Sequence, residues 1–276
     1  MLTAILALAA VALALSFVLA IAARVFAVDV DPRAEKIEEA LPGANCGACG
    51  LPGCSELARR IAEGKADIDA CPVGGAAVAR AIAAIMGQDF AGGGVRRVAM
   101  VMCNGGDESA RRRFWYNGVR DCNSAALLFG GDKSCAYGCL GLGTCAGVCP
   151  FGAIDMTGAG LAVVDPARCT GCTKCVDACP KGIIRMVPAD RTIHILCSSH
   201  DKGARTRKVC SVGCIGCMKC VKAAPEGAIA MDRNLAVVSY ETAIPPGVAG
   251  ECPMKTIHVR DLDEPAAPCA AAGGEA

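Results

Sequence analysis

The cysteines are the residues of this chain whose type and spacing could do chemistry. The 276 residues include 21 cysteines but only three histidines. Such a cysteine content indicates either a disulfide scaffold or metal ligation, and the spacing decides between them. Disulfide scaffolds are usually short, secreted domains. Here the cysteines recur with two, three or five residues between them, and several precede proline. That pattern is typical of thiolates arranged around an iron–sulfur cluster.

A complete cluster-binding motif, CTGCTKCVDACP, begins at Cys169, and a variant of it begins at Cys135. In paired ferredoxin motifs the fourth cysteine of each run binds the cluster of the other run. This crossing rule predicts two [4Fe-4S] clusters, one held by Cys135, Cys139, Cys145 and Cys179, and the other by Cys149, Cys169, Cys172 and Cys175. Between the runs, residues 153–165 alternate around two glycines and predict a short hairpin.

The cysteine pattern returns 75 residues later, which predicts a duplicated module. Cys122, Cys135, Cys139 and Cys145 correspond in this alignment to Cys197, Cys210, Cys214 and Cys220. The second copy lacks cysteine at four ligand positions, which are Ala224 and the neighbourhood of Ala243, Pro246 and Ala249. Under the crossing rule all four belong to one cluster, so the second module should have lost that cluster as a unit. The other cluster keeps Cys214, Cys217, Cys220 and Cys252.

A separate set of four cysteines lies nearer the N-terminus, within PGANCGACGLPGC and at the following Cys-Pro pair. Its members are Cys46, Cys49, Cys54 and Cys71. Four cysteines also suit a structural zinc ion, but this spacing is unlike a two-knuckle zinc site and favours an iron–sulfur cluster. Residues 55–64 predict a helix with Ser55 as N-cap and Gly64 as stop, and residues 76–86 predict another. The chain should therefore hold at least three [4Fe-4S] clusters, and four with the second module's set.

Four further cysteines could form a site of their own on an interface between the modules. They are Cys103, Cys122, Cys197 and Cys210. The alternative is that they are buried free thiols packed as small hydrophobic residues. Cys269 lies in a tail rich in alanine, proline and glycine and is expected to take no part.

The N-terminal segment predicts how these sites are held at a membrane. Residues 2–23 contain no charged or amide side chain, and that length suffices to cross a bilayer. No basic residue precedes the run, which favours a retained anchor over a cleaved signal peptide. Unpaired thiols suit a reducing cytoplasm. We therefore expect a single-pass protein of the cell (inner or cytoplasmic) membrane, with its cluster domains on the cytoplasmic side.

The predicted fold class is α+β, with a transmembrane helix, a small helical four-cysteine domain and duplicated bacterial-ferredoxin-like modules. The expected bounds are 1–26 for the anchor, 32–90 for the four-cysteine domain, 95–190 and 191–262 for the two modules, and 263–276 for a flexible tail. A net charge of +1 gives no sign of nucleic-acid binding. Arg96, Arg97 and Arg111–Arg113 form either a solvated basic face or a docking patch for an acidic carrier. No residue constellation suits hydrolysis, and the three histidines are expected to be structural.

With these motifs in this order, the sequence resembles the B subunit of the Rnf complex, in a long form with a second ferredoxin module. The resemblance implies a membrane-bound complex that oxidises reduced ferredoxin, reduces NAD⁺ and translocates Na⁺ or H⁺. This chain would then pass electrons from soluble ferredoxin toward flavin-bearing and membrane partner subunits in the lipid bilayer. Two other classes stay open, namely a polyferredoxin carrier of a different membrane oxidoreductase without ion pumping, and a zinc-binding interaction scaffold.

Overall fold

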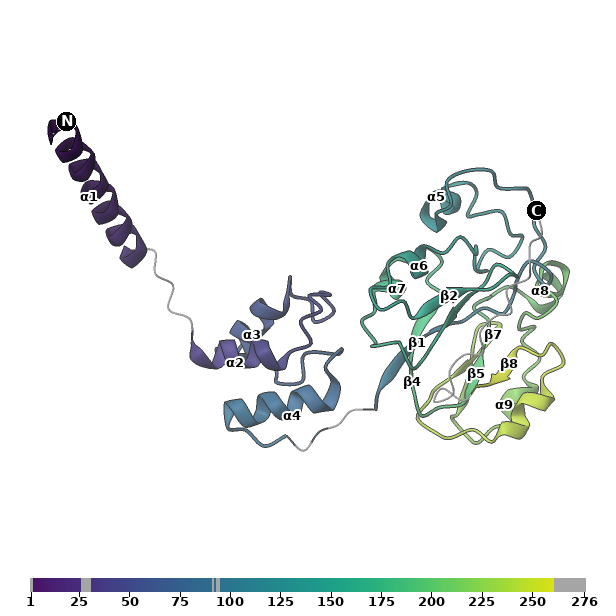
Figure 1. Ribbon diagram of the computed structural model, residues 1–276. Helices are drawn as coiled ribbons and strands as arrows, with labels where there is room; N and C mark the ends of the chain where they lie inside the picture. Colours follow the sequence, from purple (N-terminus) through teal and green to yellow (C-terminus); the bar gives the residue numbers. More distant parts are fainter. Residues whose placement is uncertain (1, 26–30, 91, 93–94, 261–276) are drawn as a thin grey trace.

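The computed structural model describes residues 2–25, 31–90, 92 and 95–260 (Figure 1). The predicted anchor forms helix α1 (Leu2–Val25). In the described part of the chain, no helix was found to combine the length and the hydropathy of a membrane span, so the membrane-spanning part of the prediction is not confirmed. Cys269 and the predicted tail 263–276 lie outside the described residues.

Three helices form the unit that carries the N-terminal cysteine set. They are α2 (Pro32–Ala40), α3 (Cys54–Ala62) and α4 (Gly75–Met86). Ile37, Leu57 and Ile82 are almost fully buried in its core. The helix predicted over residues 76–86 is confirmed as α4.

The predicted N-cap of α3, Ser55, is wrong by two residues. Helix α3 begins at Cys54 with Gly53 as N-cap, and Gly53 has no side chain that could accept a hydrogen bond. Asn45 from the preceding loop takes over this role, because its Oδ1 accepts the Cys54 N–H at 2.8 Å. The first turn of the helix is thereby tied to the loop that holds Cys46 and Cys49.

The first strand-bearing module is closed by its two outermost strands. Strand β1 (Arg97–Val101) pairs antiparallel with β4 (Ile184–Pro188). Inside this pair lies the predicted hairpin, confirmed as β2 (Ile154–Met156) and β3 (Ala162–Val164). The short helices α5, α6 and α7 complete the module, over Cys122–Leu127, Thr144–Gly147 and Lys174–Asp177.

The second module repeats the same arrangement. Strand β5 (Ile193–Ile195) pairs with β8 (Ile257–Val259), and β6 (Ile229–Asp232) forms a hairpin with β7 (Leu235–Val238). Its helical turns are α8 (Gly203–Val209), α9 (Lys219–Ala223) and the 3₁₀ helix η1 (Pro246–Glu251). The two modules lie side by side (Figure 1), with hydrogen bonds such as Asn104 N to Leu196 O at 3.2 Å between them.

Two of the four positions where the second module lacks its ligands, Ala224 and Ala249, pack against a hydrophobic core, and the other two, Ala243 and Pro246, are exposed. Val248 of η1 is 3% exposed and belongs to the core of this module. Ala224 and Ala249 pack against the same core, together with Tyr240 and Ile244. Half of the positions of the predicted missing cluster therefore take part in ordinary apolar packing.

Candidate metal centres

Three loops with the same backbone carry eight of the sixteen cysteines in residues 95–260. They run over residues 139–145, 169–175 and 214–220. Each has a glycine at positive φ, at Gly141, Gly171 and Gly216, where an added Cβ would meet a backbone oxygen at 2.4, 2.8 and 2.9 Å. Each also has a left-handed residue two positions before its last cysteine, at Gly143, Thr173 and Met218. The shared conformation places the cysteines of all three loops in equivalent positions.

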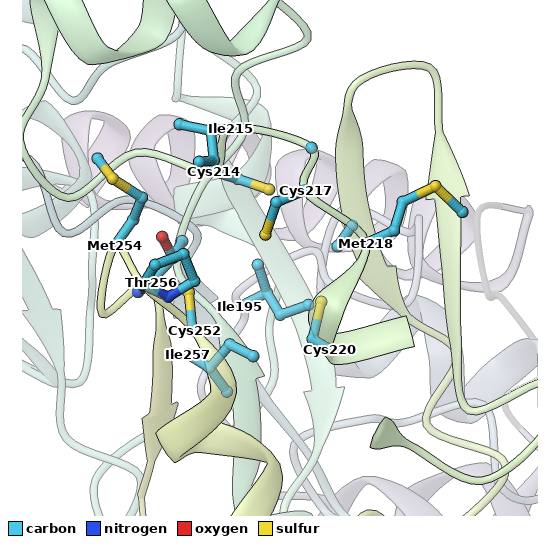
Figure 2. Close-up of a pocket in the computed structure, with 13 residues that line it drawn as sticks. Ile195, Cys214, Ile215, Cys217, Met218, Cys220, Cys252, Met254, Thr256 and Ile257 are labelled. Atoms are coloured by element: carbon cyan, nitrogen blue, oxygen red, sulfur yellow. Dashed lines mark hydrogen bonds between the residues drawn. The ribbon is translucent and has the colours of Figure 1, made fainter. Parts of the chain in front are cut away.

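The loop of the second module builds a cavity with four thiols. Its lining includes Cys214, Cys217, Cys220 and Cys252. Figure 2 shows these four side chains arranged around one space, with Ile195 and Ile257 beside it. Cys252 reaches it from the segment between η1 and β8, as the crossing rule predicts. The Cys252 Sγ accepts the Thr256 N–H at 3.4 Å.

A second cavity, in the first module, is lined by the complete predicted set Cys149, Cys169, Cys172 and Cys175. Backbone amides point at two of its sulfurs, from Ala153 to Cys149 and from Ala99 to Cys169, both at 3.4 Å. Hydrogen bonds of this kind to thiolate sulfur raise the reduction potential of an iron–sulfur cluster, because they stabilise the extra negative charge of the reduced state.

The lining of the third cavity differs from the predicted ligand set in one cysteine. Cys139, Cys145 and Cys179 line it as expected, but the fourth cysteine is Cys122 and not Cys135. The reason lies in the shared loop, whose middle ligand position is Cys172 or Cys217 in the other two loops and Leu142 here. The missing thiol is supplied from outside the loop, by the first residue of α5.

A hydrogen-bonded chain holds Cys122 at this cavity. The Cys122 N–H donates to Thr144 Oγ1 at 2.7 Å, and the Thr144 hydroxyl donates to the Asp121 carboxylate at 2.7 Å. Asp121 is also the N-cap of α5, since it accepts the Ser124 N–H at 2.8 Å. Thr144 begins α6 next to Cys145, so the two helices that carry Cys122 and Cys145 are tied together.

The structural partner of Cys197 also differs from the sequence alignment. Cys197 is the second residue after strand β5, and the residue in the same place after β1 is Cys103. Cys122 instead opens a helix in the long connection between β1 and the first loop. Cys103 of the first module therefore corresponds to Cys197 of the second, and Cys135 corresponds to Cys210.

The N-terminal set gathers against the core of the helical unit. Cys71 is buried, and its Sγ accepts the Gly74 N–H at 3.4 Å. Burial raises the pKa of Cys71, and the nearby thiols of Cys54 and Cys46 add to the rise. Cys49 packs against the same core. The structure therefore brings Cys49, Cys54 and Cys71 to one core, with Cys46 close enough to act on the pKa of Cys71.

The described cysteines are free thiols, and several of them are buried next to other thiols. Every cysteine from Cys46 to Cys252 is free. Burial, with neighbouring thiols adding to it, raises the pKa of Cys145 and Cys220 to about 11 and that of Cys175 to about 12. Within the described residues no three His, Cys, Asp or Glu side chains are close enough to share a single metal ion. A four-iron cluster is wider than one ion, and four thiols around a cavity fit it.

The five arginines of the predicted basic face are all exposed, and most of them also make contacts within the chain. Arg96 donates to the carbonyl oxygens of Pro166 and Cys169, and Arg97 to that of Met186. Arg112 pairs with Asp107 and Asp132, and Arg113 donates to Gly131 O at 2.7 Å. Four of the five arginines thus make contacts inside the chain, which favours a solvated basic face over the alternative of a docking patch.

Comparison with known proteins places these sites in a family. Residues 41–73 match the family model described as "Putative Fe-S cluster", and residues 134–183 match the "4Fe-4S dicluster domain". The chain is 49% identical over 223 residues to the B subunit of the Na(+)-translocating ferredoxin:NAD(+) oxidoreductase complex of Acetobacterium woodii, a match that covers 81% of this chain and 67% of that protein.

Two further relatives agree with this match. The B subunit of the ion-translocating oxidoreductase complex of Methanosarcina acetivorans is 41% identical, over 92% of this chain and 96% of its own length. The B subunit of the proton-translocating ferredoxin:NAD(+) oxidoreductase complex of Clostridium ljungdahlii is 43% identical, over 83% and 80%. The chain therefore belongs to the B-subunit family of the Rnf-type ion-translocating oxidoreductase complexes.

Proposed function

We propose that this chain is the iron–sulfur electron-transfer subunit of an Rnf-type ion-translocating complex. It accepts electrons from reduced ferredoxin and relays them toward membrane subunits and ultimately NAD⁺. The observation that carries the proposal is the presence of three cavities, each lined by four free cysteines, in a chain of this family. The relatives' names supply the ferredoxin donor and the nicotinamide acceptor.

Four [4Fe-4S] clusters make up the proposed relay. Their ligands are Cys46, Cys49, Cys54 and Cys71; Cys122, Cys139, Cys145 and Cys179; Cys149, Cys169, Cys172 and Cys175; and Cys214, Cys217, Cys220 and Cys252. When bound, each cluster supplies one-electron redox chemistry. The protein contributes the thiols, a dry apolar surround and amide donors to sulfur, which set the potential and limit access of water.

The proposal places the relay beside a membrane. Helix α1 has no charged residue before Arg24, and we propose that it attaches the chain to the cytoplasmic membrane with the cluster domains on the cytoplasmic side. The bounds 1–26, 32–90, 95–190 and 191–262 are proposed for the four parts. Deletion of residues 1–26 should release the chain into the soluble fraction. A shortened chain that still pellets with carbonate-washed membranes would contradict the membrane attachment by α1.

One experiment tests the function as a whole. The complex is purified anaerobically with this chain carrying Cys217→Ala, or with Met218→Ala as a matched control in the same loop. We expect Cys217→Ala to lower iron and sulfide per chain and to slow NAD⁺ reduction by reduced ferredoxin at least tenfold, while Met218→Ala keeps both near wild type. A colourless wild-type protein that contains zinc and no sulfide would overturn the proposal.

A further inference from the structure

The contact between the two modules brings together two equivalent cysteines. Asn104 N donates to Leu196 O at 3.2 Å, and the Ser198 hydroxyl donates to Met102 O at 2.9 Å. These bonds lay the segment after β1 against the segment after β5. Cys103 and Cys197 are the central residues of the two segments, so both lie at the junction between the modules.

A second equivalent pair lies at the same junction. Residues 109–112 run between the two modules, because Arg111 N donates to Val209 O at 2.9 Å and Arg111 O accepts from Ser134 N at 2.7 Å. Ala110 forms a β-bridge with Cys210 on one side, and Arg112 forms one with Lys133 on the other. Cys210 and Cys135 therefore flank a single extended segment. Both are 8% exposed.

The sulfur atoms of these cysteines lie near one another. A Cβ added at Gly105 would be 3.2 Å from Cys210 Sγ and 3.7 Å from Cys103 Sγ, so both sulfurs border the same glycine. Burial raises the pKa of Cys135, and the thiols of Cys103 and Cys210 add to the rise because they are close to it. The thiol of Cys103 acts on the pKa of Cys197 in the same way.

The surroundings of this group suit a negatively charged centre. Backbone amides already point at two of the sulfurs, from Cys139 to Cys103 at 3.5 Å and from Cys214 to Cys197 at 3.3 Å. The side chain of Lys133 is fully buried beside the junction, with its Nζ 3.1 Å from Gly105 O. A cluster with four thiolates carries net negative charge, and a buried ammonium next to it offsets part of that charge.

We propose that Cys103, Cys135, Cys197 and Cys210 hold a fifth iron–sulfur cluster at the junction of the two modules. The proposal deepens the electron-relay function and rests on it. Each module contributes one thiol that follows its first strand and one thiol that precedes its first cluster loop. The centre lies between the cavity of Cys122, Cys139, Cys145 and Cys179 and that of the second module, because Cys139 and Cys214 donate amides into it. Electrons could then pass between the modules through it.

The test compares wild-type full-length chain with the double variant Cys103→Ala, Cys210→Ala, both purified anaerobically. Iron, zinc and acid-labile sulfide are measured per chain, and Mössbauer spectra count the cluster types. We expect the double variant to lose about four irons and four sulfides, while the spectra of the other clusters remain. Cys122→Ser is the matched control, since it should alter only the cluster of Cys139, Cys145 and Cys179.

The outcomes separate this proposal from the function itself. A double variant with wild-type iron and sulfide, or one that loses only zinc, overturns the fifth cluster and leaves the relay intact. Wild-type protein without iron and sulfide overturns both. If the double variant does not fold, the single variant Cys103→Ser tests the fifth cluster instead, because a serine oxygen can replace the thiolate as a ligand. The expected result is then a full iron content with one altered spectral component, and an unaltered spectrum contradicts the proposal.

Discussion

At the scale of single residues, buried charged and titratable groups next to the cysteines decide how the sites behave. Lys133 is the clearest case, because its side chain is fully buried and pairs with Asp107 at 3.5 Å. Its positive charge lowers the pKa of both Cys139 and Cys210, although burial outweighs it and raises both. The same charge should favour the reduced form of any cluster held by these thiols.

Lys133→Met should therefore lower the reduction potential of the clusters near the module junction. Two unit charges about 8–16 Å apart interact by about 1–2 kcal/mol at an effective dielectric constant near 20. For one electron this energy corresponds to roughly 40–90 mV. Anaerobic redox titration followed by EPR measures the shift. Lys133→Arg keeps the charge and serves as the control. Unchanged potentials in Lys133→Met would show that Asp107 cancels the lysine charge.

His194 should make the second module sensitive to acid. It is fully buried, its Nδ1 lies 2.9 Å from Tyr240 Oη, and burial lowers its pKa from 6.5 to about 4, with Arg260 adding to the effect. The unfolded state binds the proton more readily, so stability is full above pH 6.5 and falls as the pH drops toward 4. Between pH 7 and 5 the free energy of unfolding should fall by about 2 kcal/mol.

Urea unfolding at several pH values measures this dependence. In His194→Phe the group that takes up the proton is gone, so most of the loss between pH 7 and 5 should disappear. The variant also leaves the Tyr240 hydroxyl without this partner, which should cost about 1 kcal/mol at every pH. An equal pH dependence in both proteins would assign the acid sensitivity to other groups.

At the scale of elements, the same loop is used three times, with one substitution. The loop needs a glycine at positive φ and a left-handed residue before its last cysteine, and residues 139–145 satisfy both requirements. Position 142 of this loop is a leucine, and the proposed fourth ligand is Cys122 at the start of α5. The Asp121–Thr144 hydrogen bond fixes the two elements against each other.

This exchange can be reversed by mutation. Cys122→Ala should remove the cluster of Cys139, Cys145 and Cys179, with a loss of about four irons per chain. Adding Leu142→Cys should restore it, because the backbone of this loop already matches the loops that carry Cys172 and Cys217. Iron analysis and EPR of the single and double variants measure loss and rescue. A full iron content in Cys122→Ala would contradict Cys122 as the fourth ligand, whereas a loss in Cys135→Ala alone would not, since Cys135 is a proposed ligand of the junction cluster.

At the scale of the whole molecule, the fold has little regular structure to hold it together. Each of the four described sheets has two strands, and the strands are three to five residues long. Isolated two-stranded ribbons are marginally stable in water. Inorganic clusters can supply the missing stability, because binding of a metal centre contributes directly to the free energy of folding.

Removal of the clusters should therefore unfold the two modules before the helical unit. Anaerobic treatment with an iron chelator and an oxidant should abolish amide protection over residues 95–260 in hydrogen-exchange mass spectrometry. Helix α4, with Ile82 in an apolar core, should keep more of its protection. Refilling with iron and sulfide should restore the native pattern. Native-like protection of β1 and β4 in the cluster-free protein would show that side-chain packing suffices.

The sequence alone determined the local features of this protein. The cysteine spacing of residues 169–175 implies its loop, the two glycines near residue 159 imply the hairpin, and the joint absence of four cysteines implies one missing ligand set. Local spacing and turn chemistry carry this information, since each ligand of a loop is fixed by its neighbours in the chain. Helix α4 was also predictable, because the local sequence of residues 76–86 is typical of a helix.

Only the tertiary structure decided which distant thiols meet. The equal offset of 75 residues paired Cys122 with Cys197, whereas in space Cys197 matches Cys103, because each follows the first strand of its module. Residues 104–133 form a long connection without a cysteine motif. The sequence around Cys122 therefore does not predict which other cysteines it lies beside. The roles of Arg96, Arg112 and Lys133 depend on carbonyl and carboxylate groups far away in sequence. Such contacts exist only once the two modules have packed together.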